Sequence, residues 1–226
     1  MKFTNKKVII FDLDGTLIDS APDLALAINH MLTKLNRKTF SSDTIRYWVG
    51  SGAETLIKRA LSGGLEIDET IEKSLWRENE KICFDFYAKN STINTVTYPH
   101  VVSSLQKLKE HGFILAIVTN KPFSFIDPIL KALHLSEFFK IILGADSLEK
   151  KKPNPMPLLH VCDKLGFSVE QAVMVGDSKS DILAGHACNM QTIGVSYGYN
   201  YDEDISTYNP NIILDNFSDI LTVLID

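Results

Sequence analysis

Apolar residues recur along the chain with two different periods. A short continuous apolar run, VIIF at residues 8–11, predicts a buried strand near the N-terminus. From about residue 20 the apolar positions recur at helical spacing, which predicts helices over 24–35, 44–48, 54–61 and 71–86 with no strand between them. Ser20 followed by Asp23 matches the S-x-x-D signal with which many helices begin. The first strand is therefore followed by a block of helices, broken at residues 50–52 and 62–64 by glycine.

After about residue 98 the pattern changes to an alternation of helices and strands. We predict helices over 101–111, 125–133, 158–165 and 182–188 and near the C-terminus, with strands over 113–118, 140–143, 172–176, 192–195 and 211–214. Continuous apolar strands between helices are typical of a parallel sheet that is covered on both faces. We therefore predict an α/β protein with a Rossmann-like parallel-sheet core, residues 1–17 and 90–226, and an inserted all-helical domain, residues 18–89.

Composition and charge exclude several classes of function. The 226 residues are 45% hydrophobic and carry a net charge of −5, which argues against a broad basic surface for nucleic acid. The three cysteines are far apart and form no CxxC pair, so we expect reduced thiols rather than disulfides or a zinc site. The apolar run near the N-terminus is too short for a signal peptide, and no segment has the length of a membrane span. We expect a cytoplasmic protein with no membrane or nucleic-acid partner.

Polar side chains follow the predicted strands where those strands end. In open α/β sheets, ligands bind beyond the carboxyl ends of the strands, near the point where the strand order reverses. Any one of these residues alone has a plain explanation as a turn, a helix cap or a solvated charge. Together they predict one site, made of Asp12, Asp14 and Gly15 after the first strand, Thr119 and Asn120 after 113–118, Lys152 after 140–143, and Asp177 with Asp181 after 172–176.

Phosphoryl transfer explains this set of residues. A carboxylate can attack phosphorus and form an aspartyl-phosphate, which divides one difficult displacement into two easier ones. Mg²⁺ prefers oxygen ligands, which suits the carboxylates of Asp12 and Asp177 and the backbone carbonyl of Asp14. A turn at Gly15 leaves Asp12 facing the phosphorus and Asp14 facing the leaving oxygen, first as general acid and then as base for water.

Four motifs resemble those of the haloacid dehalogenase superfamily: "DLDGT", "VTN", "KKPNP" and "GDSKSD", in the family's order. The longer stretches "DLDGTLIDSAPDL", "VTNKP", "KKPNPMPLL", "VGDSKSDI" and "YGYNY" are similar to the phosphoglycolate phosphatases of that superfamily. Met156 departs from the pattern, since relatives often carry an acidic residue there. The resemblance implies that Asp12 is the nucleophile, Asp14 the general acid and base, and Lys152 a catalytic cation. It also implies phosphate contacts from Gly15, Thr119, Asn120 and Lys152. The implied Mg²⁺ ligands are Asp12, Asp14 and Asp177, with Asp181 as an indirect or water-mediated partner.

The same resemblance implies that the helical insertion is a cap that closes over the site. The loop Gly50, Ser51 and Gly52 then faces the substrate, and its backbone N–H groups, which open a helix, suit a carboxylate; the plain alternative is a turn. Lys58 and Arg59 on the next helix are possible anion contacts, with a solvated surface charge as the alternative for Arg59. The implied activity is Mg²⁺-dependent hydrolysis of a small phosphate monoester, 2-phosphoglycolate, to glycolate and phosphate.

Other readings of the same motifs stay open. A sugar-phosphate mutase or another small-metabolite phosphatase of the superfamily shares the catalytic motifs and differs in its cap contacts. A phospho-receiver signalling module also forms an aspartyl-phosphate beside Thr and Lys, but its acceptor usually lies on a middle strand. A dehalogenase attacks carbon and needs neither Mg²⁺ nor a second acid at Asp14.

Overall fold

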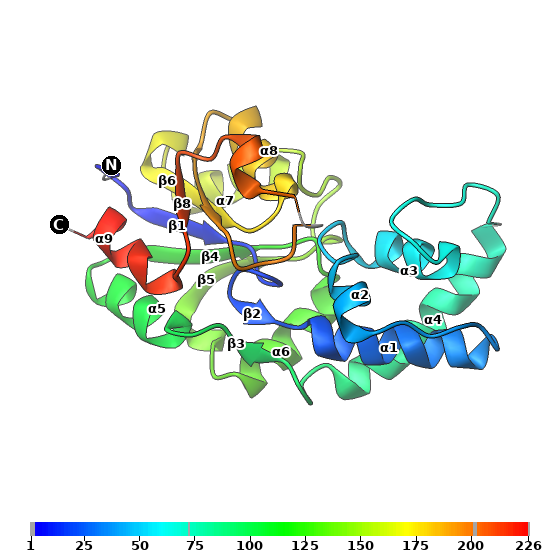
Figure 1. The fold of residues 1–226 in the computed structure, drawn as a ribbon. Coiled ribbons are helices and arrows are strands. Elements are labelled where there is room, and N and C mark those ends of the chain that lie inside the picture. The colour runs from blue at the N-terminus through cyan, green and yellow to red at the C-terminus, as the bar shows by residue number, and fades with distance from the viewer. Residues whose placement is uncertain (1–2, 72, 201–202, 226) are drawn as a thin grey trace.

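A six-stranded parallel sheet forms the centre of the computed structural model, which describes residues 3–71, 73–200 and 203–225 (Figure 1). Three parts of the predictions lie outside these ranges: Tyr201 of the YGYNY stretch, Glu72 of the predicted helix 71–86, and the first two residues and the last residue of the predicted core domain. The strand order is β5-β4-β1-β6-β7-β8. The strands are β1 (Val8–Phe11), β4 (Ile114–Val118), β5 (Phe139–Leu143), β6 (Ala172–Gly176), β7 (Gln191–Val195) and β8 (Ile212–Leu214).

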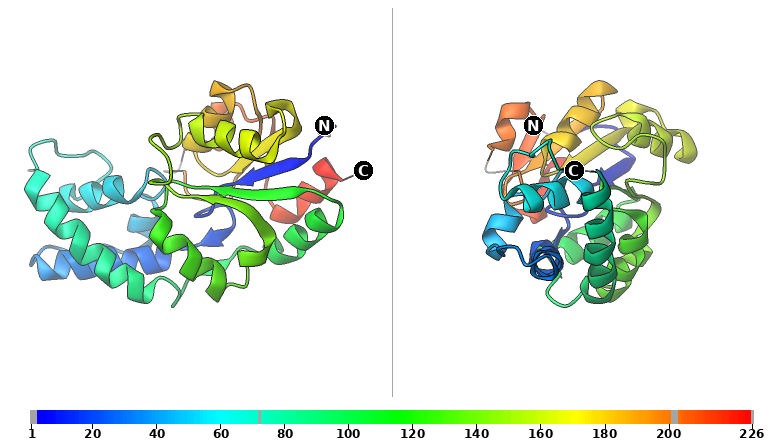
Figure 2. Two further views of the ribbon diagram at one scale, coloured as in Figure 1. Left: turned by 180° about the vertical axis from the view of Figure 1, so that it is seen from behind. Right: turned by 90° about the vertical axis from the view of Figure 1, so that its right-hand side faces the viewer.

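Helices cover both faces of the sheet, because side chains alternate between the faces along each strand. On β1, Ile9 and Phe11 join one apolar core while Val8 and Ile10 join the other. The first core includes residues of α5 (Val101–Glu110), α6 (Ile126–Ala132) and α9 (Ile220–Leu224), and the second includes residues of α7 (Met156–Leu165) and α8 (Lys179–Ala187). Figures 1 and 2 show these two helical layers on opposite sides of the strands. The predicted α/β class is confirmed.

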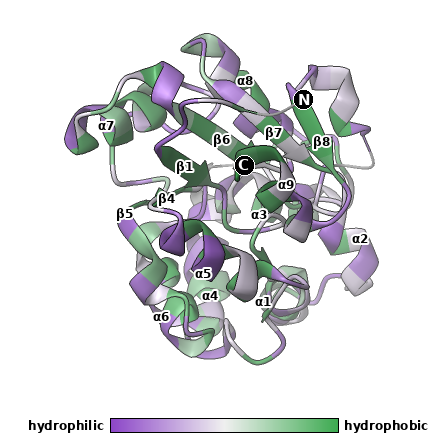
Figure 3. Ribbon diagram, turned by 90° about the vertical axis from the view of Figure 1, so that its left-hand side faces the viewer, coloured by the Kyte–Doolittle hydropathy of each residue, from purple (hydrophilic) through white to green (hydrophobic). Residues whose placement is uncertain are grey.

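Hydropathy separates the inside of this core from its outside. In Figure 3 the strands are mostly hydrophobic, whereas the helices carry hydrophilic stretches around them. All three cysteines are unpaired, as predicted. Among the described residues, no helix combines the length and the apolar content that crossing a bilayer requires.

The strand order reverses at β1. This strand pairs in parallel with β4 on one side and with β6 on the other, while the chain reaches β4 first and β6 later. The chain segments next to β1 therefore lead to opposite sides of this strand, and a crevice forms between them at the carboxyl end of β1. Asp12 follows β1, Thr119 follows β4 and Asp177 follows β6. The topology thus brings three of the predicted site residues to one edge.

A block of four helices lies beyond this edge of the sheet (Figure 1). It consists of α1 (Ala21–Lys34), α2 (Ser42–Arg46), α3 (Ala53–Ser62) and α4 (Lys73–Asn90), and the ring of His30 on α1 stacks on that of Phe86 on α4 at 4.2 Å. The predicted helices are present, but a two-stranded antiparallel ribbon at the base of the block, β2 (Ile18–Asp19) with β3 (Val96–Thr97), was not predicted. Strands of two residues are too short to show an apolar period.

The start of α1 differs from the predicted capping pattern. Ser20 occupies the N-cap position, but its hydroxyl donates to Asp14 instead of accepting from the helix. The carboxylate of Asp23 is fully buried and accepts hydrogen bonds from the backbone and side chains of Asn94 and Thr95 at 2.7–3.0 Å. Asp23 therefore connects α1 to the segment that leads into β3. The two residues of the S-x-x-D signal make tertiary contacts and do not cap the helix.

We expect Asp23→Ala to lower the free energy of unfolding by about 3 kcal/mol, because it leaves the buried donors of Thr95, together with the donors of Asn94, without their acceptor. Urea unfolding followed by circular dichroism measures this change. Asp127→Ala is the matched control, since Asp127 makes an exposed ion pair with Lys131 and should change stability by less than about 0.5 kcal/mol. Equal effects of the two variants would contradict the assignment.

Candidate active site

Asp12 lies directly after β1, beside a buried lysine. Its Oδ1 atom is 3.1 Å from Nζ of Lys152 and accepts a 2.7 Å hydrogen bond from the N–H of Leu13. Lys152 is 1% exposed and also donates to Oδ1 of Asp181 at 2.5 Å. Oδ2 of Asp181 accepts from the N–H and the hydroxyl of Ser178 at the start of α8, which fixes the carboxylate. Asp181 therefore holds Lys152 toward Asp12.

Asp177 approaches the same place from the end of β6. The hydroxyl of Thr16 donates to its Oδ1 and the backbone N–H of Tyr199 donates to its Oδ2, each at 2.7 Å. Gly15 has a φ of +84°, and a Cβ atom there would lie 2.2 Å from Oδ2 of Asp177, so only glycine fits this turn. The N–H of Gly15 donates to the carbonyl of Ile18, and its predicted contact with phosphate stays a prediction.

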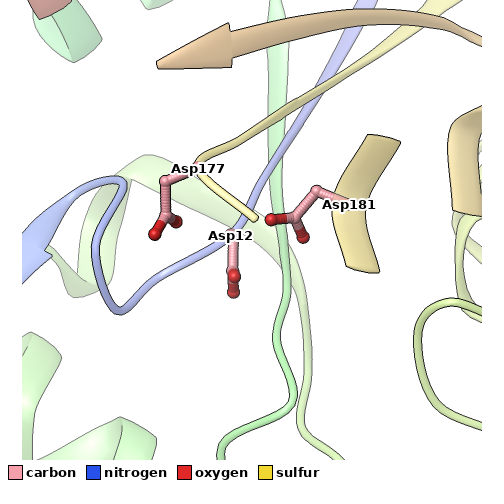
Figure 4. A group of neighbouring side chains, drawn as sticks. All are labelled: Asp12, Asp177 and Asp181. Atoms are coloured by element: carbon pink, nitrogen blue, oxygen red, sulfur yellow. The ribbon is translucent and has the colours of Figure 1, made fainter. Parts of the chain in front are cut away.

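Asp12, Asp177 and Asp181 form a compact acidic cluster. One carboxylate oxygen from each lies within 4.8 Å of the others, and Figure 4 shows Asp177 and Asp181 on either side of Asp12. Burial raises the pKa of Asp12 to about 7, although Lys152 acts in the opposite direction. Burial, with repulsion from Asp12 and Asp181, also raises the pKa of Asp177 well above its ordinary value. Ionising both carboxylates is therefore costly in this buried cluster.

The excess negative charge of the acidic cluster suits a divalent cation. When ionised, the three carboxylates carry three negative charges against the single ammonium of Lys152, which leaves two uncompensated. Buried charges of one sign are costly without a partner, and clustered carboxylate oxygens are the ligands that Mg²⁺ prefers. The donor set and its net charge thus fit a hard divalent metal.

Asp14 is held apart from the acidic cluster by other partners. Its carboxylate accepts a hydrogen bond from the Ser20 hydroxyl at 2.5 Å, and Nζ of Lys121 lies 2.9 Å and 3.1 Å from its two oxygens. Lys121 also donates to the hydroxyl oxygen of Tyr87 on α4 at 2.8 Å. The metal ligand predicted at Asp14 was its backbone carbonyl, and this role stays a prediction. The carboxylate lies outside the acidic cluster, and its role as general acid and base also stays a prediction.

Lys121 and Tyr87 were missed by sequence reasoning. Lys121 follows Asn120 directly at the end of β4, so its place at the sheet edge was a usable signal. Tyr87 carried no such signal, because it occupies an ordinary position of a helix 34 residues earlier in the chain.

The two predicted phosphate contacts after β4 are both buried beside the cluster. The hydroxyl of Thr119 accepts from the N–H of Lys121 at 3.2 Å. The side-chain amide of Asn120 donates to the carbonyl of Lys152 at 3.0 Å, which connects the loops after β4 and β5. Within the described part of the chain, the amide oxygen of Asn120 has no hydrogen-bond partner. Their binding of phosphate stays a prediction.

A small cavity of about 60 Å³ lies between the sheet edge and the helical block. The core contributes polar groups to its wall and the block contributes mainly apolar ones. The core side includes Asp12, Asp14, Thr119, Asn120 and Lys121, and the block side includes Val49, Gly50, Gly52, Ala53, Leu56, Ile57, Phe84 and Tyr87. A Cβ atom at Gly52 would lie 3.3 Å from the carbonyl oxygen of Asn120, so the loop before α3 reaches the site.

A family model covers most of the chain, including the residues of this site. The model for haloacid dehalogenase-like hydrolases matches residues 9–195, a span that contains Asp12, Asp14, Thr119, Lys152 and Asp177. The chain belongs to the haloacid dehalogenase-like hydrolase family. This family membership confirms the resemblance drawn from the four motifs and makes the protein an enzyme, a hydrolase.

Relatives of this hydrolase match it over nearly its whole length. It is 48% identical over 224 residues to a phosphoglycolate phosphatase of Colwellia psychrerythraea, with 99% of each chain covered. It is 50% identical over 222 residues to a phosphoglycolate phosphatase of Psychrobacter arcticus, with 98% of this chain and 96% of the other covered. The crystal structure of a predicted phosphoglycolate phosphatase from Haemophilus somnus 129PT superposes with a TM-score of 0.90 at 38% identity, covering 97% and 98% of the two chains.

The two residues of the helical block that the sequence suggested as anion contacts have other partners. Lys58 forms an ion pair with Glu54 at 2.6 Å, four residues earlier on α3. The guanidinium of Arg59 donates to the backbone carbonyls of Trp48 and Leu65 at 2.7 Å and 3.3 Å. Both side chains thus stabilise the block itself. Their predicted contact with an anion has no support in this arrangement.

Proposed function

We propose that this hydrolase is a Mg²⁺-dependent phosphatase that converts 2-phosphoglycolate to glycolate and phosphate through an aspartyl-phosphate on Asp12. One observation carries the proposal: a single small cavity borders Asp12 and Asp14 on one side and the Gly50–Gly52 loop on the other. Both ends of a very small anionic ester can then be contacted at once. The names of the relatives support the same substrate.

In the first step, a carboxylate oxygen of Asp12 attacks the phosphorus and the bond from phosphorus to the glycolate oxygen breaks. Asp14 gives its proton to that oxygen, so glycolate leaves as an alcohol and not as an alkoxide. Lys152, held by Asp181, places a positive charge beside the attacking carboxylate and the phosphoryl oxygens. Thr119 and Asn120 orient the phosphoryl group from the end of β4.

In the second step, water attacks the phosphorus of the aspartyl-phosphate. Asp14, now a carboxylate, accepts a proton from that water, and the bond from phosphorus to Asp12 breaks. Phosphate leaves, and both aspartates return to their starting forms. A receiver module would preserve the phosphoryl group, but an acid placed two residues after the nucleophile supports turnover.

The acidic cluster supports the metal in this proposal. Asp12, Asp177 and the backbone carbonyl of Asp14 would hold Mg²⁺, with Asp181 acting indirectly through Lys152. A bound Mg²⁺ would neutralise charge on the phosphoryl oxygens and reduce their repulsion of the nucleophile.

We propose further that residues 18–89 form a cap over the core of residues 1–17 and 90–226. The wall that the block adds to the cavity supports this division. Helix α3 begins at Ala53, and its first N–H groups have no partner within the helix. We assign the substrate carboxylate to this end of α3 and to the Gly50, Ser51 and Gly52 loop, where the helix dipole favours an anion.

The substrate assignment predicts a clear order of kcat/KM. 2-Phosphoglycolate should exceed ethyl phosphate by at least about tenfold, because ethyl phosphate lacks the carboxylate and its charged hydrogen bonds. Hexose phosphates should be poorer still, because they are larger and their hydroxyl groups would face the mainly apolar wall that the helical block adds to the cavity. Phosphate release measured over this panel tests the order. Better turnover of hexose phosphates, or isomerisation of β-glucose 1-phosphate, would favour the mutase or another phosphatase instead.

A glycine pair at the two ends of α3 provides matched variants for the carboxylate contact. Gly52 and Gly63 both have left-handed φ angles, of +92° and +78°, but a Cβ at Gly63 would meet only Phe40 within the block. Gly52→Ala should lower kcat/KM for 2-phosphoglycolate more than for ethyl phosphate. Gly63→Ala should affect both substrates alike. Equal losses for both substrates in Gly52→Ala would remove the loop from the carboxylate site.

A further inference from the structure

We propose that Tyr87, a residue of the helical block, is a positioning residue for Asp14 and acts through Lys121. The inference rests on the proposed function, in which Asp14 is the general acid. Through Tyr87 and Lys121, the packing of the helical block against the core then determines the orientation of the Asp14 carboxyl.

The contacts form a continuous chain across the boundary between block and core. The hydroxyl oxygen of Tyr87 accepts from Nζ of Lys121 at 2.8 Å, and the same Nζ lies 2.9 Å from Oδ1 of Asp14. Each residue comes from a different segment: Tyr87 from α4, Lys121 from the loop after β4 and Asp14 from the turn after β1. Nζ also lies 4.9 Å from the centre of the Tyr87 ring.

Burial makes this chain rigid. The exposed fraction is 6% for Lys121 and 3% for Tyr87, so water does not compete for their polar groups. Asp14 is the acidic partner of Lys121 in the structure, and Tyr87 supplies the neutral acceptor. Burial acts to lower the pKa of Lys121, but Asp14 and Tyr87 outweigh it and raise the pKa. Lys121 therefore remains an ammonium whose place is set by these two groups.

The ring of Tyr87 is itself fixed by an aromatic cluster. It meets the ring of Phe125, at the start of α6, edge-on at 5.1 Å, and Phe84 meets Phe125 in the same way at 5.0 Å. The hydroxyl therefore reaches Lys121 only when α4 is seated against the core. Without the Tyr87 hydroxyl as acceptor, the ammonium of Lys121 can move together with Asp14. The carboxyl of Asp14 is then no longer oriented toward the leaving oxygen.

Two small substrates with different leaving groups separate this role from simple packing. Glycolate leaves phosphorus as a poor leaving group that needs a proton, whereas acetyl phosphate releases acetate, a stable anion that needs none. The value of kcat/KM reports the steps up to the first irreversible one, which includes departure of the leaving group. The ratio of kcat/KM for the two substrates also cancels any difference in the fraction of folded enzyme.

The experiment measures this ratio, 2-phosphoglycolate over acetyl phosphate, for the wild type, Tyr87→Phe, Lys121→Met and Asp14→Asn at saturating Mg²⁺. We expect the ratio to fall about tenfold in Tyr87→Phe, the size expected for one hydrogen bond to a charged group. It should fall further in Lys121→Met and most in Asp14→Asn. Tyr47→Phe, an exposed tyrosine of the same block, is the control and should leave the ratio unchanged.

Each outcome has one meaning. A fall in Tyr87→Phe and Lys121→Met together with Asp14→Asn supports the inference. An unchanged ratio in Tyr87→Phe, with a fall in Asp14→Asn, overturns the inference and leaves the proposed function standing. An unchanged ratio in Asp14→Asn shows that Asp14 is not the acid, and the proposed function then fails with the inference.

Discussion

Replacing Asp12 with asparagine is expected to lower kcat for 2-phosphoglycolate by more than about 10⁴-fold, the scale on which loss of a nucleophile acts. The side chain keeps its size but loses the oxygen that attacks phosphorus and the charge that would help to hold Mg²⁺. Phosphate release under single-turnover and steady-state conditions measures the effect. Trapping the phosphorylated enzyme after acid quench should yield a signal in the wild type and none in Asp12→Asn.

The fold should survive this substitution. Lys152 keeps its 2.5 Å contact with Asp181, and the acidic cluster loses one of three mutually repelling groups. Burial raises the pKa of Asp12 to about 7 in the folded protein, so stability falls as the pH rises from the ordinary pKa of an aspartate through about 7, and the loss is complete at pH 8. The Tm of metal-free Asp12→Asn at pH 8 should therefore equal or exceed that of the wild type. Substantial residual turnover in a well-folded variant would defeat the role of Asp12.

Removal of divalent cations is expected to abolish turnover. EDTA should reduce phosphate release to background and added Mg²⁺ should restore it, because the ion pairs of the described residues set one lysine, Lys152, against the three carboxylates of the cluster. Binding has a second readout that does not depend on turnover. A ligand that binds only the folded state raises Tm, so Mg²⁺ should stabilise the metal-free wild type.

Asp177→Asn tests whether the acidic cluster is where the cation binds. It should lower kcat and reduce the Mg²⁺-dependent rise in Tm, because one charged ligand is lost. Asp127→Asn, which changes an exposed carboxylate on α6, should keep the full rise. Full activity in EDTA would show that the carboxylates serve another purpose, and an unchanged rise in Asp177→Asn would place the cation elsewhere.

Local pattern predicted much of this protein. The two apolar periods indicated the helical block and the parallel α/β core, because burial on one helix face or on both sheet faces imposes those periods. The site residues Asp12, Thr119 and Asp177 were predicted because parallel strands deliver the residues after them to one edge. The sequence by itself thus determined the class of fold and which polar residues lie at the ends of the strands.

The tertiary structure alone decided how those groups are held. The deciding contacts join residues that lie 6 to 107 positions apart in the chain. They are the hydrogen bonds to Asp14 and Asp23, the ion pair of Asp181 with Lys152 and the hydrogen bond of Tyr87 with Lys121. The two-residue ribbon at the base of the block also arises only when its strands meet. Such pairs leave no period in the sequence, because a hydrogen bond depends on where two side chains meet in space and hydrophobic periodicity depends only on which face is buried.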